Sequence, residues 1–207
     1  MHADADFSAK ARDLIRFGKF CYKRGWVPAT SGNFSVRLDS GQVAITVSGQ
    51  HKGKLNKDGI MVVDLQGTPL TAGRKPSAET LLHTALYRRD ATINAVLHTH
   101  SVNATVLSLL HREALRLTDY EVLKAFPGID THEGQVSVPI FSNDQDMGRL
   151  AATVDRYLDK QPGLHGYLIA GHGFYAWGAS MAEASRHIEA FEFLFDCEVL
   201  LRRLGKP

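Results

Sequence analysis

The sequence predicts a single α/β domain in three layers, with helices on both faces of a central, mostly antiparallel sheet. Three observations support this prediction. Helical periodicity alternates with short β-like segments along the chain, and several of those segments follow one another across turns, as hairpins do. No Gly-x-Gly-x-x-Gly or Walker-type loop is present to indicate a doubly wound nucleotide-binding fold. The 207 residues suit one domain over 1–207, without linker or repeat.

Composition narrows the class of protein. Charged residues make up 22% of the chain and the formal net charge is +2, with Lys and Arg scattered, so we expect no nucleic-acid partner. No apolar run approaches the roughly 20 residues of a membrane span. The acidic start, residues 1–6, is unlike a signal peptide. Cys21 and Cys197 are expected to be reduced core thiols inside helices, which favours a cytoplasmic protein.

The first half of the chain is expected to hold two helices and four strands. An amphipathic helix over 8–24 presents Ala11, Leu14, Phe17 and Cys21 on one stripe, and Gly25 follows its end. Ser77 is a candidate N-cap for a second helix over 78–88. The β-like segments, separated by turn residues, are 33–38, 43–47, 61–65 and 93–100.

The second half continues the alternation. We expect helices over 102–110 and 144–159, a short helix opened by Thr118-x-x-Glu121, and strands over 136–141 and on both sides of His172. Thr118-x-x-Glu121 and Ser180-x-x-Glu183 both have the spacing of a capping box, in which each end satisfies the other's backbone amide. The second box opens a long C-terminal helix that ends at Gly205.

Two histidines at the end of a strand are the main functional signal. His98 and His100 are two residues apart, so their side chains share one face of the strand. His172 lies between two glycines at the end of another apolar run. Three imidazoles so placed can chelate a divalent metal such as Zn²⁺. The plain alternative is a set of strand-end histidines without a ligand. His83 and His187, within helices, are expected to be packing or surface residues.

Five motifs together resemble the class II, zinc-dependent sugar-phosphate aldolase/epimerase family, in the family's order and over nearly the whole chain. They are Ala29-Thr30-Ser31-Gly32-Asn33-Phe34-Ser35, Thr46-Val47-Ser48-Gly49, Lys75-Pro76-Ser77-Ala78-Glu79, His98-Thr99-His100 and Gly171-His172-Gly173. The resemblance implies one Zn²⁺ per subunit on His98, His100 and His172, a ketose phosphate substrate, and a homotetramer with active sites near subunit interfaces.

Two carboxylates compete for acid/base chemistry. The counterpart of Glu79 is the base in the aldolases, whereas Glu121 lies where the family's dehydratases carry their acid/base glutamate. Segments 25–33 and 120–124 are most similar to those dehydratases. Structural roles are the alternatives, because Glu79 could complement a helix dipole and Glu121 could complete a capping box. A sugar-phosphate dehydratase is therefore the expected function, and the alternatives are an aldolase, a pentulose-phosphate 4-epimerase and a catalytically inactive binding relative.

The resemblance also implies a phosphate site built from loops. Polar glycine turns offer backbone amides and short side-chain donors, a combination that binds oxyanions. These turns hold Ser31, Gly32, Asn33, Ser48, Gly49 and Ser77. Ordinary turn and cap use is the alternative for each. Ala78 stands where the aldolases typically carry a second serine, and Lys75, Lys52 and Lys124 are candidates to supply positive charge.

Overall fold

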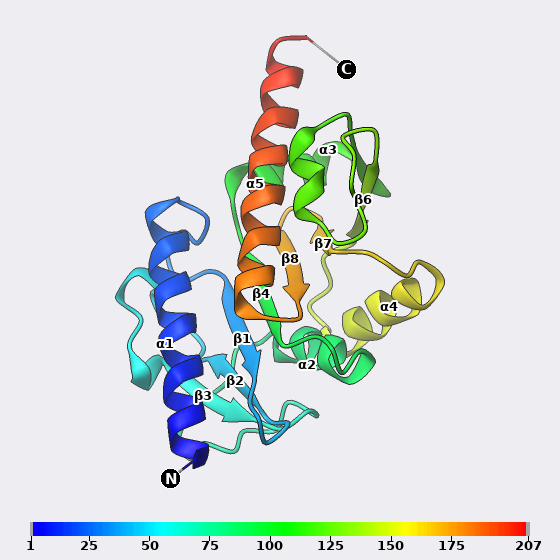
Figure 1. The fold of residues 1–207 in the computed structure, drawn as a ribbon. Helices are drawn as coiled ribbons and strands as arrows, with labels where there is room; N and C mark the ends of the chain where they lie inside the picture. Colours follow the sequence, from blue (N-terminus) through cyan, green and yellow to red (C-terminus); the bar gives the residue numbers. More distant parts are fainter. Residues whose placement is uncertain (1, 206–207) are drawn as a thin grey trace.

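The computed structural model describes residues 2–205, and these form helices around one eight-stranded sheet (Figure 1). The helices are α1 His2–Lys23, α2 Thr80–Arg89, α3 Val102–Leu110, α4 Met147–Lys160 and α5 Met181–Arg203, with short 3-10 turns η1 Lys52–Lys54, η2 Lys57–Gly59 and η3 Glu121–Ala125. The strands are β1 Asn33–Arg37, β2 Val43–Thr46, β3 Ile60–Val63, β4 Ala95–Thr99, β5 Ala114–Thr118, β6 Gln135–Phe141, β7 Gly166–Ile169 and β8 Gly173–Gly178.

The sheet is antiparallel except at one pair of strands. Its order is β3-β2-β1-β4-β8-β7-β6-β5, and only β6 and β7 run parallel among the described strands. That exception has a simple cause, because α4 connects β6 to β7 as a crossover helix. The predicted, mostly antiparallel sheet is therefore confirmed.

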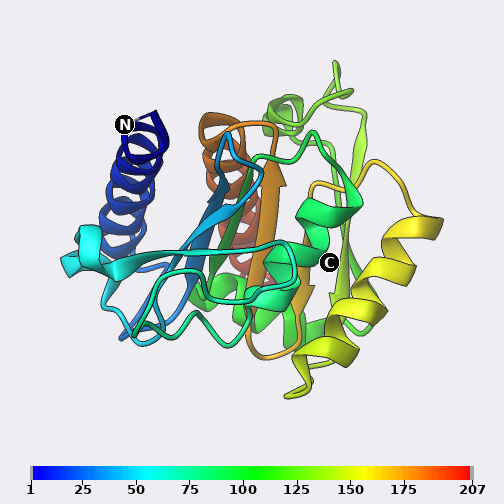
Figure 2. The ribbon, with the colours of Figure 1, turned by 90° about the horizontal axis from the view of Figure 1, so that it is seen from below.

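Each face of the sheet is covered by helices. One core joins α1, α3 and α5 to the sheet, and it contains the predicted stripe Ala11, Leu14, Phe17 and Cys21. The other core packs α2 and α4 on the opposite face, through residues such as Leu86 and Val154. Figure 2 shows α1 and α5 on one side of the strands and α4 on the other. The three-layer α/β/α prediction is thus confirmed.

Of the three helix caps predicted from the sequence, one is confirmed and two are wrong. The Ser180 hydroxyl caps α5 by accepting from the Glu183 amide, as predicted. The prediction for Ser77 is wrong, because α2 begins at Thr80 with Glu79 as its N-cap residue and Ser77 accepts from the Glu79 amide instead. The capping box at Thr118 is also wrong. Thr118 ends strand β5, which was not expected from the sequence, and Tyr120 precedes η3.

The structure also bears on the two cysteines and on the expectation of no membrane-spanning segment. Cys21 and Cys197 are both free thiols in helices; Cys21 is buried in the core as predicted, but Cys197 is only half-buried, so the core prediction is wrong for Cys197. Among the helices of residues 2–205, none combines the length and apolar character needed to cross a bilayer.

Candidate metal centre and active site

Four side chains from distant parts of the chain converge at one end of the sheet. His98 lies in β4, His100 follows β4 directly, and His172 lies in the turn between β7 and β8. Glu79 joins them from the start of α2. One ligand atom of each side chain lies within 4.8 Å of those of the others. The pairing of Thr99 with Phe174 explains the arrangement, since it places the β7–β8 turn beside the end of β4.

Two glycines make this close approach possible. A Cβ on Gly173 would stand 2.2 Å from the Thr99 carbonyl oxygen and 2.9 Å from the His98 ring. Gly32 has a φ of +75°, and a Cβ there would lie 2.8 Å from the His98 carbonyl oxygen. Both positions therefore require glycine, because any side chain would push β4 away from its neighbours.

The orientation of His98 leaves one nitrogen for a metal ion. Its Nδ1–H donates to the Phe174 carbonyl at 3.0 Å, so Nε2 carries the lone pair. Nε2 is buried and has no hydrogen-bond partner among the described residues. It stands 3.3 Å from Oε2 of Glu79, where a lone pair faces a carboxylate oxygen. A cation would resolve that unfavourable contact, so the donor set fits a divalent metal.

The charges of the cluster also suit a metal. Burial lowers the pKa of His98 to about 4 and that of His100 to about 3, and repulsion between the imidazoles adds to the effect. Burial raises the pKa of the Glu79 carboxyl, but His98, His172 and the Asn33 amide outweigh burial and hold this pKa well below its usual range. At neutral pH His98 and His100 are therefore neutral and Glu79 is ionised, the forms that bind metals.

Glu79 is the centre of the contacts in this cluster. Its Oε1 lies 2.7 Å from Nε2 of His172, and its Oε2 accepts from the Asn33 side-chain amide at 2.5 Å. The ring of Tyr175 stacks on His98, with 4.0 Å between ring centroids. From the sequence, Glu79 is a possible base and Asn33 a possible phosphate ligand, and nothing in the motifs predicts that one holds the other.

The candidate phosphate residues line one cavity of about 180 Å³ beside Glu79 and His100. The predicted residues that line it are Ser31, Gly32, Asn33, Ser48, Gly49 and Ser77. Lys75 is exposed and outside this lining, although its carbonyl accepts from the Ser48 amide. Lys52 is the lysine in the lining, and only 1% of it is exposed.

Lys52 has an environment unlike that of an ordinary surface lysine. Its Nζ donates to the Thr30 carbonyl at 3.0 Å and to the Gln50 carbonyl at 2.7 Å. Burial lowers the pKa of Lys52 to about 8, while the nearby Glu79 opposes this shift. The side chain thus ties two cavity loops together and remains largely charged at neutral pH.

Glu121 lies apart from this buried group. It begins η3, its side chain is 71% exposed, and its Oε1 accepts from Lys124 at 2.6 Å. That hydrogen bond, together with the lysine's charge, lowers the pKa of the Glu121 carboxyl. Among the residues that the structure describes, Lys124 is its side-chain partner, and no member of the histidine cluster contacts it. The structure therefore does not bring the two glutamates together.

The fold and the cluster match a known class of proteins. Residues 12–199 match the family model of the Class II Aldolase and Adducin N-terminal domain, and the chain belongs to this family. The family that the motifs suggested is therefore confirmed. Two curated relatives named methylthioribulose-1-phosphate dehydratase are those of Methylococcus capsulatus, 58% identical over 96% of each chain, and of Pseudomonas aeruginosa, 57% identical over 94% of this chain and 96% of the relative.

Solved structures agree with this assignment. YgbL from Escherichia coli, described as a putative aldolase/epimerase/decarboxylase, superposes with a TM-score of 0.81 at 26% identity, covering 95% of this chain and 91% of YgbL. L-fuculose-1-phosphate aldolase from Thermus thermophilus superposes with a TM-score of 0.75 at 28% identity and covers 97% of both chains.

Proposed function

We propose that this chain catalyses the zinc-dependent dehydration of 5-methylthioribulose 1-phosphate to 2,3-diketo-5-methylthiopentyl 1-phosphate in methionine salvage. The observation that carries the proposal is the buried group of three histidines and Glu79 in a chain 57–58% identical to relatives named methylthioribulose-1-phosphate dehydratase. This name agrees with the dehydratase expected from segments 25–33 and 120–124.

The metal would be held by the histidine nitrogens. His98, His100 and His172 would bind one Zn²⁺ per subunit, and the orphaned Nε2 of His98 is the direct support. When bound, the ion polarises the substrate carbonyl and so acidifies the adjacent carbon. Neutral imidazoles leave the ion its full double charge, which suits this electrostatic role.

The reaction requires two proton movements at neighbouring carbons. One proton passes from C3 to a base, and the hydroxyl on C4 departs as water once it receives a proton; the enol so formed tautomerises to the second ketone as its hydroxyl proton is replaced by a proton on C4. Glu121, acting directly or through water, would serve the C4 hydroxyl. Glu79 keeps an ionised carboxylate at the histidines, but a carboxyl with so depressed a pKa is a weak base. We therefore assign Glu79 mainly to orienting the site.

The phosphate would bind in the cavity lined by the polar glycine turns. Ser31, Ser48 and Ser77 supply hydroxyls there, and the turns supply backbone amides. Of the three candidate lysines, we assign Lys52 to the phosphate, because it lines the cavity while Lys75 is exposed and Lys124 pairs with Glu121. A bound dianion would also offset the cost of burying its ammonium group.

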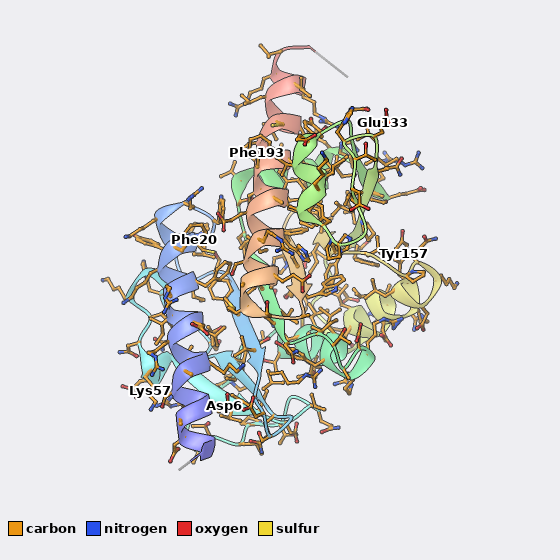
Figure 3. The ribbon with its side chains drawn as sticks, in the orientation of Figure 1. Asp6, Phe20, Lys57, Glu133, Tyr157 and Phe193 are labelled. Atoms are coloured by element: carbon orange, nitrogen blue, oxygen red, sulfur yellow. The ribbon has the colours of Figure 1, made fainter. Side chains whose placement is uncertain are left out.

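We further propose a cytoplasmic homotetramer. Helix α3 begins after Ser101, next to His100, and exposes an apolar surface: Val102 is 70% exposed and Leu109 67%. Leu109 also borders Gly171, next to His172. Phe193 on the outer side of α5, labelled in Figure 3, is 50% exposed. Apolar surface beside a site is typical of interfaces between subunits.

The test is to incubate the zinc-loaded protein with 5-methylthioribulose 1-phosphate and follow the products by mass. Loss of one water without carbon–carbon cleavage is the expected result. Two smaller fragments would establish the rival aldolase, and an isomer of unchanged mass the 4-epimerase. Freshly purified protein without metal and without turnover would support the inactive binding relative instead.

A further inference from the structure

Beneath the metal cluster, a buried ladder of polar side chains joins strand β1 to helix α2. Asn33 and Ser35 are two apart on β1, whereas Glu79, His83 and Tyr87 are four apart along α2 and its N-cap. Two residues of a strand advance about 6.7 Å and four residues of a helix about 6 Å, so the two series stay in step. All five residues are at most 9% exposed.

Hydrogen bonds cross between the two series at every step. The Asn33 amide nitrogen donates to Oε2 of Glu79 at 2.5 Å, and the Asn33 oxygen contacts Nε2 of His83. Nδ1 of His83 lies 2.7 Å from the Ser35 hydroxyl, which lies 2.8 Å from the Tyr87 hydroxyl. Neither the fold nor the proposed chemistry has yet required His83 or Tyr87.

The chemistry of the groups sets one direction for the whole ladder. Asn33 turns its NH₂ to Glu79 and its oxygen to His83, so the amide donates to the carboxyl group and accepts from the imidazole. His83 must then carry its proton on Nε2, since burial lowers its pKa to about 4 and the ring is neutral. Its bare Nδ1 accepts from Ser35, whose oxygen is left to accept from Tyr87. Every donor therefore points toward Glu79.

We propose that His83 is a positioning residue that acts on Glu79 through Asn33. The Nε2–H of His83 holds the Asn33 amide in the one orientation that donates to Glu79, because the flipped amide would place its oxygen against the carboxylate. Glu79 is thereby kept aimed at the histidines. The inference rests on the proposed function only in assigning a metal to this cluster; the proton position on His83 stands independently.

The first experiment locates that proton. Wild-type protein labelled with ¹⁵N-histidine is examined at pH 7 by long-range ¹H–¹⁵N correlation, and the His83 signals are identified by their loss in His83→Gln. A neutral ring protonated at Nε2 is the expected result. A proton on Nδ1 alone would overturn the proposal, because His83 could not then donate to Asn33.

The second experiment measures the affinity of the protein for Co²⁺, in the absence of substrate, from the absorption bands of the bound ion. His83→Leu should weaken binding by about 10-fold, the lower end of the range for residues that support a metal site from outside its ligands. His83→Gln should recover most of this loss, because its amide can donate to Asn33. The matched control is Thr84→Val, a buried neighbour on α2 whose hydroxyl bonds only within the helix. It should bind Co²⁺ as wild type does.

A double-mutant cycle asks whether His83 works through Glu79. If it does, His83→Leu should have little further effect on Co²⁺ affinity in a Glu79→Gln background. Full additivity, or a folded His83→Leu with wild-type affinity, would contradict the proposal. Should His83→Leu fail to fold, the proton position decides. Because neither experiment uses the ketose phosphate, a protein that fails to dehydrate it but passes both tests would refute only the proposed function.

Discussion

Two glutamates of this chain lie in opposite environments, one buried and one exposed, although each is near a lysine. Glu79 is buried at the N-cap of α2, contacts His98, His172 and Asn33, and shares its cavity with the buried Lys52. Glu121 stands on the short turn η3, largely exposed, and forms a surface pair with Lys124. Such surface pairs contribute little to stability. Glu121 can therefore move to a substrate at small cost, whereas moving Glu79 would disrupt a network.

The comparison suggests a division of labour. A carboxylate fixed by several partners is well placed to organise a metal site but is a poor proton carrier. An exposed carboxylate with one surface partner is accessible to substrate and water for proton exchange. The predictions below test this division, beginning with the group to which Glu79 belongs.

The largest effect is expected from removing a histidine. Alanine at His98, His100 or His172 should remove most of the zinc and nearly all turnover while the fold survives, because the chain buries cores on both faces of its sheet without a metal. Metal analysis and thermal unfolding measure the two properties. A variant that kept full zinc and full activity would show that its histidine is not a ligand.

Next comes Glu121→Gln, which should retain zinc and substrate binding yet lose at least ~10²-fold in kcat, the low end for a positioned general acid or base. Because the exposed pair with Lys124 adds little to the fold, thermal stability should barely change. Lys124→Met is the matched control for loss of that pair. If this control lost as much kcat as Glu121→Gln, the charge pair rather than the carboxylate would matter.

The lysine beside each glutamate gives the third contrast. Lys52→Met should raise KM for the phosphorylated substrate by about 10- to 100-fold, the value of a charge-assisted hydrogen bond. Lys75→Met and Lys124→Met should leave KM near that of wild type, since both side chains are exposed. Steady-state kinetics, with inorganic phosphate as a competing ligand, separate the three. An unchanged KM in folded Lys52→Met would remove Lys52 from the phosphate site.

Glu79→Gln should reduce kcat less than Glu121→Gln does. Glutamine keeps an oxygen that can accept from Asn33 but loses the charge that faces the histidines, so we expect between about 10- and 100-fold lower kcat together with weaker metal binding. Zinc titration and kinetics on the same preparation measure both. Should Glu79→Gln abolish turnover while Glu121→Gln stays fast, the roles are reversed and the aldolase-like interpretation is the better one.

The sequence was most informative where the pattern is local. The two-residue spacing of His98 and His100 predicted their shared face, and the hydrophobic stripes predicted the helices on both sides of the sheet. Strand β5 was not predicted, because its five alternating residues, Ala114–Thr118, form only a short pattern between two helical ones. Its last residue then passed for a helix cap.

Contacts between distant segments could not be predicted in this way. Lys52 is buried only because the loops around Thr30 and Gln50 close over it. His83 looked like an ordinary helix residue, since its partners on β1 lie about 50 positions earlier in the chain. A usable signal existed in the four-residue spacing of Glu79, His83 and Tyr87, but it becomes meaningful only when β1 is known to pack beside α2.

The last expected effect is a pH dependence of stability to which the buried histidines of the site contribute. His98 and His100 stay neutral in the fold down to about pH 4 and pH 3, whereas in the unfolded chain both titrate near 6.5. Below 6.5 the unfolded state therefore binds more protons at these two residues, and each such histidine should contribute a loss of roughly 1.4 kcal/mol of unfolding free energy per pH unit in the metal-free protein. Glu79 does not oppose this trend between pH 7 and 5, because its carboxyl remains ionised throughout that window in the fold and mostly so in the unfolded chain. Urea unfolding at pH 7 and pH 5 measures the change in unfolding free energy per pH unit. His100→Gln should reduce this change by the contribution of one histidine, and Glu121→Gln should leave it unchanged. A pH dependence that disappeared in Glu121→Gln instead would contradict the contrast between the buried and the exposed glutamate.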